Sequence, residues 1–254
     1  MLQETNNVRI MTKKEQQRIE DAARRIVSKK YGWRQNSYFN WKVEDGYIFT
    51  LFCYLYGEAS LEVKPLYFDD LWWEITGMFR NEKKPPMSLR CNGSAAICAQ
   101  EIATYNAVEH DTDRYVTEGL EEIWDGVFKK AETNVRQFLK ENPDANTFFP
   151  DESKTQAFSN DRLDYIMALL HSNRDEEAIA IITEAKSKGH KCYFRYLNGE
   201  DGYDAILAWC KKRKEPQNNI STDIPKDNCS SNIAAPNKSL FKKIRDKLEK
   251  IFKK

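Results

Sequence analysis

Residues 46–79 constrain the fold more than any other part of the chain, because they form the densest apolar and aromatic run in the sequence. Two turn signals bound the first segment of this run. The Asp45-Gly46 pair favours a hairpin turn, since glycine adopts positive φ without steric cost, and residues 57–59 turn the chain again. Between the turns, residues 47–56 are apolar at both odd and even positions. This pattern predicts a central strand that is covered on both faces.

The segments beside this strand extend it into a sheet. Residues 38–44 and 60–64 alternate apolar with polar side chains, which is typical of half-buried strands. Pro65 ends the second of them, because proline has no N–H to donate to a strand ladder. Residues 95–107 fit either a helix or a further strand, and the lack of a clear 3.6-residue period favours extended structure.

Helical patterns precede and follow the sheet. The first covers residues 12–31, where Thr12 and Glu15 fit a capping box and Gly32 fits the C-terminal stop.

Further along, one long amphipathic helix runs from about residue 113 to Pro143. A helix pair at residues 163–170 and 178–185 follows, and it resembles a single tetratricopeptide-type hairpin. Residues 203–213 form a further predicted helix.

These elements predict an α+β protein, with an N-terminal helix and a small antiparallel sheet of three to four strands packed by helices. A helical C-terminal half and a tethered amphipathic helix follow. The expected organisation is an α+β domain at residues 1–110, a helical region at 111–213, a flexible linker at 214–238 and a basic amphipathic helix at 239–254. The linker is rich in Asn, Ser, Pro and Lys and poor in large apolar residues, so it is not expected to build a core.

Composition excludes several classes of protein. The formal net charge is +1 over 254 residues, which gives no global attraction to nucleic acid. The six cysteines form no CxxC pair and the three histidines are scattered, so we expect reduced, buried thiols and neither a metal site nor a cofactor. The N-terminal residues lack an apolar signal-peptide core, and no apolar run approaches the ~20 residues of a membrane span. We therefore expect a cytoplasmic protein, which reaches a membrane only peripherally.

One triplet suggests metal-dependent chemistry. Glu62-Val63-Lys64 ends a strand that follows a hairpin, and Asp45 precedes the first strand of that hairpin. This arrangement resembles restriction-endonuclease-like nucleases, in which an Asp and the Glu hold a divalent metal and the Lys activates the water. The resemblance covers about a quarter of the chain and implies catalytic roles for Asp45, Glu62 and Lys64.

The same residues also have a purely structural interpretation. A turn over residues 57–59 places Tyr54 opposite Glu62 and leaves Asp45 nine residues further along the neighbouring strand. At ~3.4 Å per residue that separation is roughly 30 Å, which is too far for a shared metal. In this interpretation Glu62 and Lys64 are the solvent-facing residues of an alternating strand.

Carboxylates gather at two further places. These are Asp69, Asp70 and Glu74 after the sheet, and Asp111 and Asp113 beside His110 before the long helix. Carboxylates near a histidine can bind a metal or transfer protons. Both Asp clusters also stand where helix N-caps are expected, so we expect Asp69 or Asp70 to cap the helix that follows the sheet.

Two aromatic features are candidates for contact surfaces. Trp72 and Trp73 point about 100° apart on a helix, so one ring is expected inside and the other at an edge, where it suits an interface anchor; alternatively both are buried. A basic and aromatic cluster comprises Lys188, His190, Lys191, Tyr193, Arg195 and Tyr196. Such a cluster suits nucleic acid, although cations at a helix end are also favoured by the helix dipole in any protein.

The C-terminal segment is the clearest candidate for an interaction surface. Residues 239–254 carry seven Lys or Arg and two acidic residues, a net charge of +5. On a helix the apolar side chains fall within an arc of roughly 120° and lysines occupy the opposite side. The apolar set is Leu240, Phe241, Ile244, Leu248, Ile251 and Phe252, and the basic set includes Lys243, Lys247 and Lys250. Such a helix can lie on an anionic membrane, dock in a partner's groove or fold back onto its own domain.

The sequence therefore favours a non-enzymatic interaction protein, an adaptor, inhibitor or immunity-like factor, whose C-terminal helix contacts a protein partner or an anionic membrane surface. The general layout resembles that of bacterial accessory and immunity-type proteins. The alternatives are a metal-dependent nuclease that uses Glu62 and Lys64, and a nucleic-acid-binding module that uses the cluster at residues 188–196.

Overall fold

The computed structural model describes residues 11–36, 39–54, 58–78, 86–91, 96–106, 119–151, 162–192 and 201–215, all within one compact unit that spans Met1–Glu215. The strands are β1 (Arg34–Asn36), β2 (Phe39–Glu44), β3 (Tyr47–Cys53), β4 (Ala59–Pro65) and β5 (Gln100–Tyr105). The α-helices are α1 (Lys13–Lys30), α2 (Leu66–Thr76), α3 (Leu120–Glu141), α4 (Leu163–His171), α5 (Asp175–Ser187) and α6 (Gly202–Lys214), with 3₁₀ helices η2 (Met87–Cys91) and η3 (Ala145–Thr147). The predicted α+β class is confirmed, with slightly more strands than expected.

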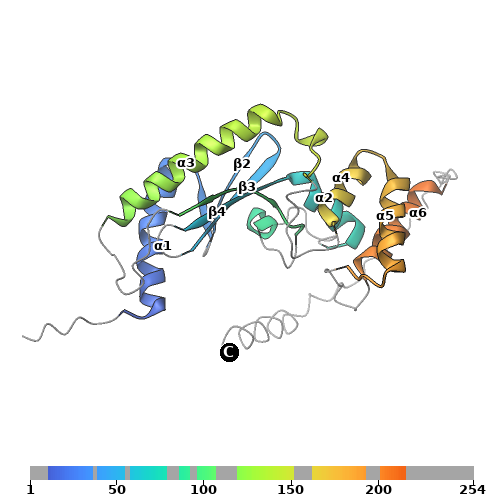
Figure 1. Ribbon diagram of the computed structural model, residues 1–254, viewed down its shortest axis with the longest axis horizontal. Coiled ribbons are helices and arrows are strands. Elements are labelled where there is room, and N and C mark those ends of the chain that lie inside the picture. Colours follow the sequence, from blue (N-terminus) through green and yellow to red (C-terminus); the bar gives the residue numbers. More distant parts are fainter. Residues whose placement is uncertain are drawn as a thin grey trace, which may run out of the picture. The chain divides into compact units, whose positions relative to one another are not determined.

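The five strands form one antiparallel sheet in chain order, β1-β2-β3-β4-β5, and α3 lies across it (Figure 1). The predicted hairpin between β2 and β3 is confirmed. Its turn residues Asp45 and Gly46 both have positive φ, 47° and 81°, as a two-residue hairpin turn requires. The extended segment expected within residues 95–107 is β5, which pairs with β4.

The register of β3 against β4 differs from the predicted one. Thr50, not Tyr54, lies opposite Glu62. The reason is a wider turn, which the Tyr54 N–H closes by donating to the Glu58 carbonyl at 2.8 Å. Glu62 therefore faces the middle of β3.

Alternation along the strands gives the sheet two buried faces. Phe49 and Leu51 are fully buried in the core cluster that α1 and α3 share. At the alternate positions, Ile48 and Thr50 are buried on the side of η2, where Thr50 Oγ1 donates to Cys91 Sγ at 3.3 Å. β3 is therefore the central strand covered on both faces that the sequence predicts.

The face of α1 that meets α3 contains buried charges. Glu20 and Arg24 are completely buried. Trp124 Nε1 of α3 donates to the Glu20 carboxylate at 2.5 Å, and Arg24 Nη2 lies 2.7 Å from Asp21 Oδ1. The Arg24 guanidinium also lies 5.7 Å from the centre of the Trp124 ring. These contacts supply the pairing that buried charges require.

Local signals at the ends of α1 and α5 are confirmed. α1 begins with the predicted capping box, in which Thr12 and Glu15 satisfy each other's backbone N–H groups. The α4–α5 pair is the expected helical hairpin, and Gly189, with φ of 77°, follows α5.

The C-terminal helices pack on α2. Both α4 and α6 contact it (Figure 1), and Trp209 Nε1 of α6 donates to the Glu74 carboxylate at 3.2 Å. Tyr67 of α2 stacks on His171 of α4, with ring centres 3.7 Å apart. α2 therefore connects the sheet to the helical half.

Gly46 and Gly32 provide a matched pair for testing the close approach of the β2–β3 turn to η3. A Cβ at Gly46 comes within 2.9 Å of the Ala145 Cβ, whereas a Cβ at Gly32, also at positive φ, meets nothing within 4 Å. Gly32→Ala is expected to cost about 1–2 kcal/mol for its left-handed backbone. Gly46→Ala is expected to cost at least about 1 kcal/mol more because of overpacking. Urea unfolding of both variants measures the difference, and equal losses contradict the close contact.

Candidate functional site

A buried ion pair joins β4, α2 and the chain that leads into β5. Lys64 Nζ lies 2.9 Å from Asp69 Oδ1 and 2.5 Å from the Ile97 carbonyl oxygen. The Lys64 and Asp69 side chains are 2% and 0% exposed. The Ile97 N–H donates to the same Asp69 oxygen at 2.9 Å. Burial raises the pKa of the Asp69 carboxyl, while the Lys64 ammonium and the Ile97 N–H act against that rise.

Two predictions about this region are wrong. α2 begins at Leu66, directly after Pro65, so Asp69 lies in the first helical turn and neither Asp69 nor Asp70 is the N-cap. Lys64 is not solvent-facing, because the Asp69 carboxylate and the Ile97 carbonyl supply buried partners for its ammonium group.

Arg90 of η2 extends this network toward the surface. Its Nη1 donates to the Leu66 carbonyl at 2.6 Å and its Nη2 to Asp70 Oδ1 at 2.5 Å. The guanidinium lies 4.7 Å from the centre of the Trp73 ring. Trp72 and Trp73 are 2% and 5% exposed, since both belong to the main core. Neither is therefore the exposed interface anchor that one interpretation of the sequence expected.

The structure does not bring the three residues of the nuclease interpretation together. Lys64 is held by Asp69, as described above. Glu62 lies between Thr50 of β3 and Glu101 of β5. Asp45 stands five residues before Thr50 in the chain. Five residues of strand correspond to ~17 Å. Across the described ranges, no group of three Asp, Glu, His or Cys side chains is placed to hold a metal ion.

The thiols behave as the sequence predicts. The five described cysteines are free, and all but Cys98 are buried. Burial raises the pKa of Cys53 to about 12 and that of Cys91 and Cys210 to about 11. These thiols therefore stay protonated at neutral pH and pack as small apolar groups.

Several predicted site residues lie outside the described residues. They are His110, Asp111, Asp113, Tyr193, Arg195, Tyr196 and the whole C-terminal set, Leu240, Phe241, Lys243, Ile244, Lys247, Leu248, Lys250, Ile251 and Phe252. Of the basic cluster, Lys188, His190 and Lys191 are described and exposed at the end of α5, where Lys188 pairs with Glu184 at 2.6 Å.

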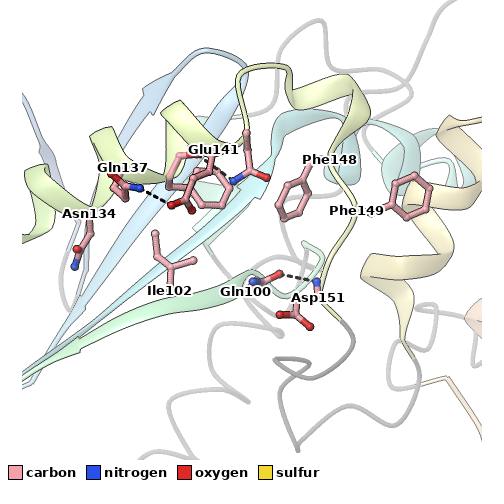
Figure 2. A pocket seen from close by; sticks show the side chains of 10 residues that line it. Gln100, Ile102, Asn134, Gln137, Glu141, Phe148, Phe149 and Asp151 are labelled. Carbon is pink, nitrogen blue, oxygen red and sulfur yellow. Dashed lines mark hydrogen bonds between the residues drawn. The ribbon is translucent and has the colours of Figure 1, made fainter.

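A pocket of about 280 Å³ opens between the C-terminal half of α3, β5 and the chain that follows η3 (Figure 2). β5 contributes Gln100 and Ile102; α3 contributes Asn134, Gln137, Phe138 and Glu141; the chain after α3 contributes Asn142, Phe148, Phe149 and Asp151. The inner wall is apolar, with the ring centres of Phe138 and Phe148 5.7 Å apart. The rim is polar, since Gln137, Glu141 and Asp151 are exposed.

Hydrogen bonds within the protein fix how three amides of this pocket point. Asn134 Nδ2 donates to the Tyr105 hydroxyl at 2.8 Å, Asn142 Nδ2 donates to the Phe138 carbonyl at 3.0 Å, and Gln137 Nε2 donates to the Glu141 carboxylate. Because each amide nitrogen has one N–H bonded within the protein, its oxygen and its second N–H are the groups that can meet a ligand.

The side-chain amide of Gln100 bonds within the protein through its oxygen instead of its nitrogen. Its Oε1 accepts from the Asp151 N–H at 3.1 Å (Figure 2), so its amide nitrogen can donate. Among the described residues that line the pocket, the remaining polar side chains are those of Glu141 and Asp151. α3 ends at Glu141, and a helix C-terminus carries the negative end of the helix dipole. The pocket is therefore rich in hydrogen-bond acceptors and negative in charge.

No pattern in the sequence distinguishes the residues of this pocket. Asn134, Gln137 and Glu141 recur at i, i+3 and i+7, which places them on one face of a helix. That polar stripe is the pattern of any solvated helix face. Gln100 and Asp151 join it only through the pairing of β5 and the path of the chain after η3.

A second, more open pocket of about 540 Å³ lies beside the β2–β3 turn. Asp45, Asp70 and Asp144 contribute to its lining, so two carboxylates that the sequence analysis named separately lie in one place. Arg90 binds the Asp70 carboxylate. Within the described residues, Asp45, Asp70 and Asp144 do not form a group that could hold a metal ion.

Comparison of the chain with protein-family models, with curated proteins and with solved structures finds no match. The site is therefore assessed from its own geometry. Among the described helices, none combines the length and the apolar character needed to cross a membrane.

Removing one member of the buried ion pair is expected to be costly. Lys64→Met leaves the Asp69 carboxylate without its nearest cation, and we expect a loss of about 3–5 kcal/mol in the free energy of unfolding. The double variant Lys64→Met/Asp69→Asn is expected to lose less, because Asn still accepts the Ile97 N–H. Guanidinium unfolding measures both.

Lys30→Met is the matched control for this measurement. Lys30 makes an exposed ion pair with Asp125 at 3.4 Å, with side chains 56% and 39% exposed. Its removal is expected to cost less than about 1 kcal/mol. A Lys64→Met loss as small as that of the control contradicts the assigned role of the buried pair.

Proposed function

We propose that this protein is an interaction protein, an adaptor or inhibitor, that binds an extended segment of a partner along β5. The observation that carries the proposal is the position of β5, which ends the sheet and borders the pocket described above. Within the described residues, no strand pairs with its second edge. An edge strand presents unpaired N–H and C=O groups, which can template an added strand.

The opposite edge of the sheet suits this role less well. β1 has only three residues, and α1 occupies its surroundings, since Gln35 Nε2 donates to the Asp21 carbonyl at 3.2 Å. β5 has six residues, of which only Tyr105 is buried. Alternate side chains of a strand added there would point toward the pocket side of the sheet.

The chemistry of the described residues supports binding rather than catalysis. The Lys64 ammonium and the Asp69 carboxylate are engaged with each other in the core. The thiols of Cys53, Cys91 and Cys210 have raised pKa values because of burial, so they are poor nucleophiles at neutral pH. The pocket beside β5 instead offers oriented hydrogen-bonding groups around an apolar wall, which suits recognition.

Sequence alone supports a second contact. The basic amphipathic segment at residues 239–254 is proposed to bind a protein partner or an anionic membrane surface, as its charge and apolar arc predict.

Strand addition predicts an alternating response to backbone methylation of the ligand. Peptides selected from a random displayed library against the full-length protein are resynthesised with N-methyl groups at every second residue. One set of positions is expected to weaken binding by more than about tenfold, because several backbone hydrogen bonds are lost. The interleaved set is expected to bind nearly as well as the unmodified peptide. Isothermal titration calorimetry measures both.

Amide hydrogen exchange locates the bound peptide. Backbone amides of residues 100–105 are expected to exchange more slowly when the peptide is bound, while those of residues 34–36 at the other edge serve as the control and stay unchanged. Equal binding of the two methylated peptides, or protection confined to α5 and α6, overturns the proposal.

Deleting residues 239–254 tests the C-terminal contact. These residues carry a net charge of +5, and each cation near an anionic surface contributes about 1 kcal/mol. The deletion is therefore expected to abolish co-sedimentation with phosphatidylserine-containing vesicles, while vesicles of phosphatidylcholine alone show little binding of either protein. Unchanged sedimentation of the truncated chain with the anionic vesicles counts against a membrane contact.

A further inference from the structure

We propose that the pocket between α3 and β5 binds an arginine side chain carried by the partner's extended segment. This inference rests on the proposed function and adds the chemistry by which the partner is recognised. The pocket volume of about 280 Å³ lies just below the range of small-molecule sites, which is about 300–1,000 Å³. It therefore suits one side chain better than a cofactor.

The hydrogen-bonding groups of the pocket select a donor. The side-chain oxygens of Asn134, Gln137 and Asn142 belong to amides whose nitrogens are bonded within the protein. Within the described residues, no other hydrogen bond engages these three oxygens. A ligand that brings several N–H groups can therefore engage all three oxygens at once, which a carboxylate, a phosphate or an apolar side chain cannot.

The charge of the pocket selects a cation. The Glu141 carboxylate lies on its rim, and the C-terminal end of α3 adds the negative end of its dipole. Among the described residues that line the pocket there is no Lys, Arg or His. A positively charged group is thus favoured by the Glu141 carboxylate and the helix dipole together.

Shape distinguishes arginine from lysine. The guanidinium carries five N–H donors in one plane, whereas an ammonium carries three at a single point. Acceptors come from several directions here, from α3, from the chain after α3 and from the rim (Figure 2). The apolar wall of Ile102, Phe138 and Phe148 can cover the methylene stem of the side chain.

The pocket also lies where an added strand would deliver such a side chain. Gln100 and Ile102 line it from β5 itself. A side chain of a neighbouring strand stands about 4.5–5.5 Å from its cross-strand partner. An arginine opposite this part of β5 can therefore reach the acceptors on α3 without any rearrangement of the sheet.

Blocked amino acids test the pocket apart from the strand. Nα-acetyl-arginine methylamide is expected to bind the full-length protein in an NMR titration. The corresponding citrulline amide, which has the same shape but a neutral urea, is expected to bind at least about tenfold more weakly because the charge-assisted hydrogen bonds are lost. The lysine amide is expected to fall between them. Equal binding of the arginine and citrulline amides overturns the inference.

A protein variant and its control locate the effect. Glu141→Gln is expected to weaken binding of the arginine amide about tenfold. Glu121→Gln removes the same charge from the exposed first turn of α3, away from the pocket, and is expected to leave binding unchanged. Thermal unfolding checks that both variants stay folded. Equal effects of the two substitutions overturn the assignment to this pocket.

Three outcomes of these experiments distinguish the arginine pocket from strand addition and from binding of a free small molecule. Peptides that protect β5 but show no enrichment of arginine overturn the inference and leave the proposed function standing. Arginine-amide binding that depends on Glu141, without alternating effects of peptide methylation, supports the pocket and overturns strand addition. Free arginine that binds more tightly than the blocked amide assigns the pocket to a small molecule and overturns the partner's side chain as its ligand.

Discussion

The ion pair between Lys64 and Asp69 is the interaction on which the arrangement of the other elements depends. It connects β4 to α2, and through Ile97 it also holds the chain that enters β5. α2 in turn carries the contacts with α4 and α6. A charge pair at this depth contributes little net stability compared with apolar residues, because desolvation offsets the attraction. Its role is directional, since the Lys64 ammonium and Asp69 Oδ1 together bind α2 and both backbone groups of Ile97.

The pocket beside β5 is a consequence of that placement. One wall belongs to α3, which lies across the sheet, and the other belongs to β5, whose entry is held at Ile97. Tyr105 joins the two walls, because its hydroxyl accepts from Asn134 of α3 while its backbone pairs with Ala59 of β4. Rigid secondary structure on both sides favours pre-organised recognition, which lowers the entropic cost of binding.

Local patterns predicted several elements of the secondary structure. The capping box at Thr12, the Asp45-Gly46 turn and the apolar strand 47–56 each gave the element that is observed, because backbone preference and burial agree there. The predicted register between β3 and β4 was wrong, since the alternation of apolar and polar residues does not determine how many residues the turn contains. The burial of Lys64 was not predicted either, because its partners are an aspartate in the first turn of α2 and a backbone carbonyl 33 residues away.

The candidate site was less predictable than the fold, and for a physical reason. A polar stripe on α3 looks the same whether it faces water or a pocket. Only the pairing of β5 and the path of the chain after η3 bring Gln100 and Asp151 to the stripe. The direction of each amide depends on hydrogen bonds such as that between Asn134 and Tyr105, which are separated by 29 residues.

The contact between α1 and α3 has a consequence for synthesis of the chain. Glu20 and Trp124, which join these helices, are 104 residues apart, whereas the sheet is built mainly from neighbouring strands. As residues leave the ribosome at about 5–20 per second, the interval between β4 and the end of α3 lasts on the order of 4–15 s. Throughout it, the nascent sheet lacks its α3 cover and exposes Phe49 and Leu51.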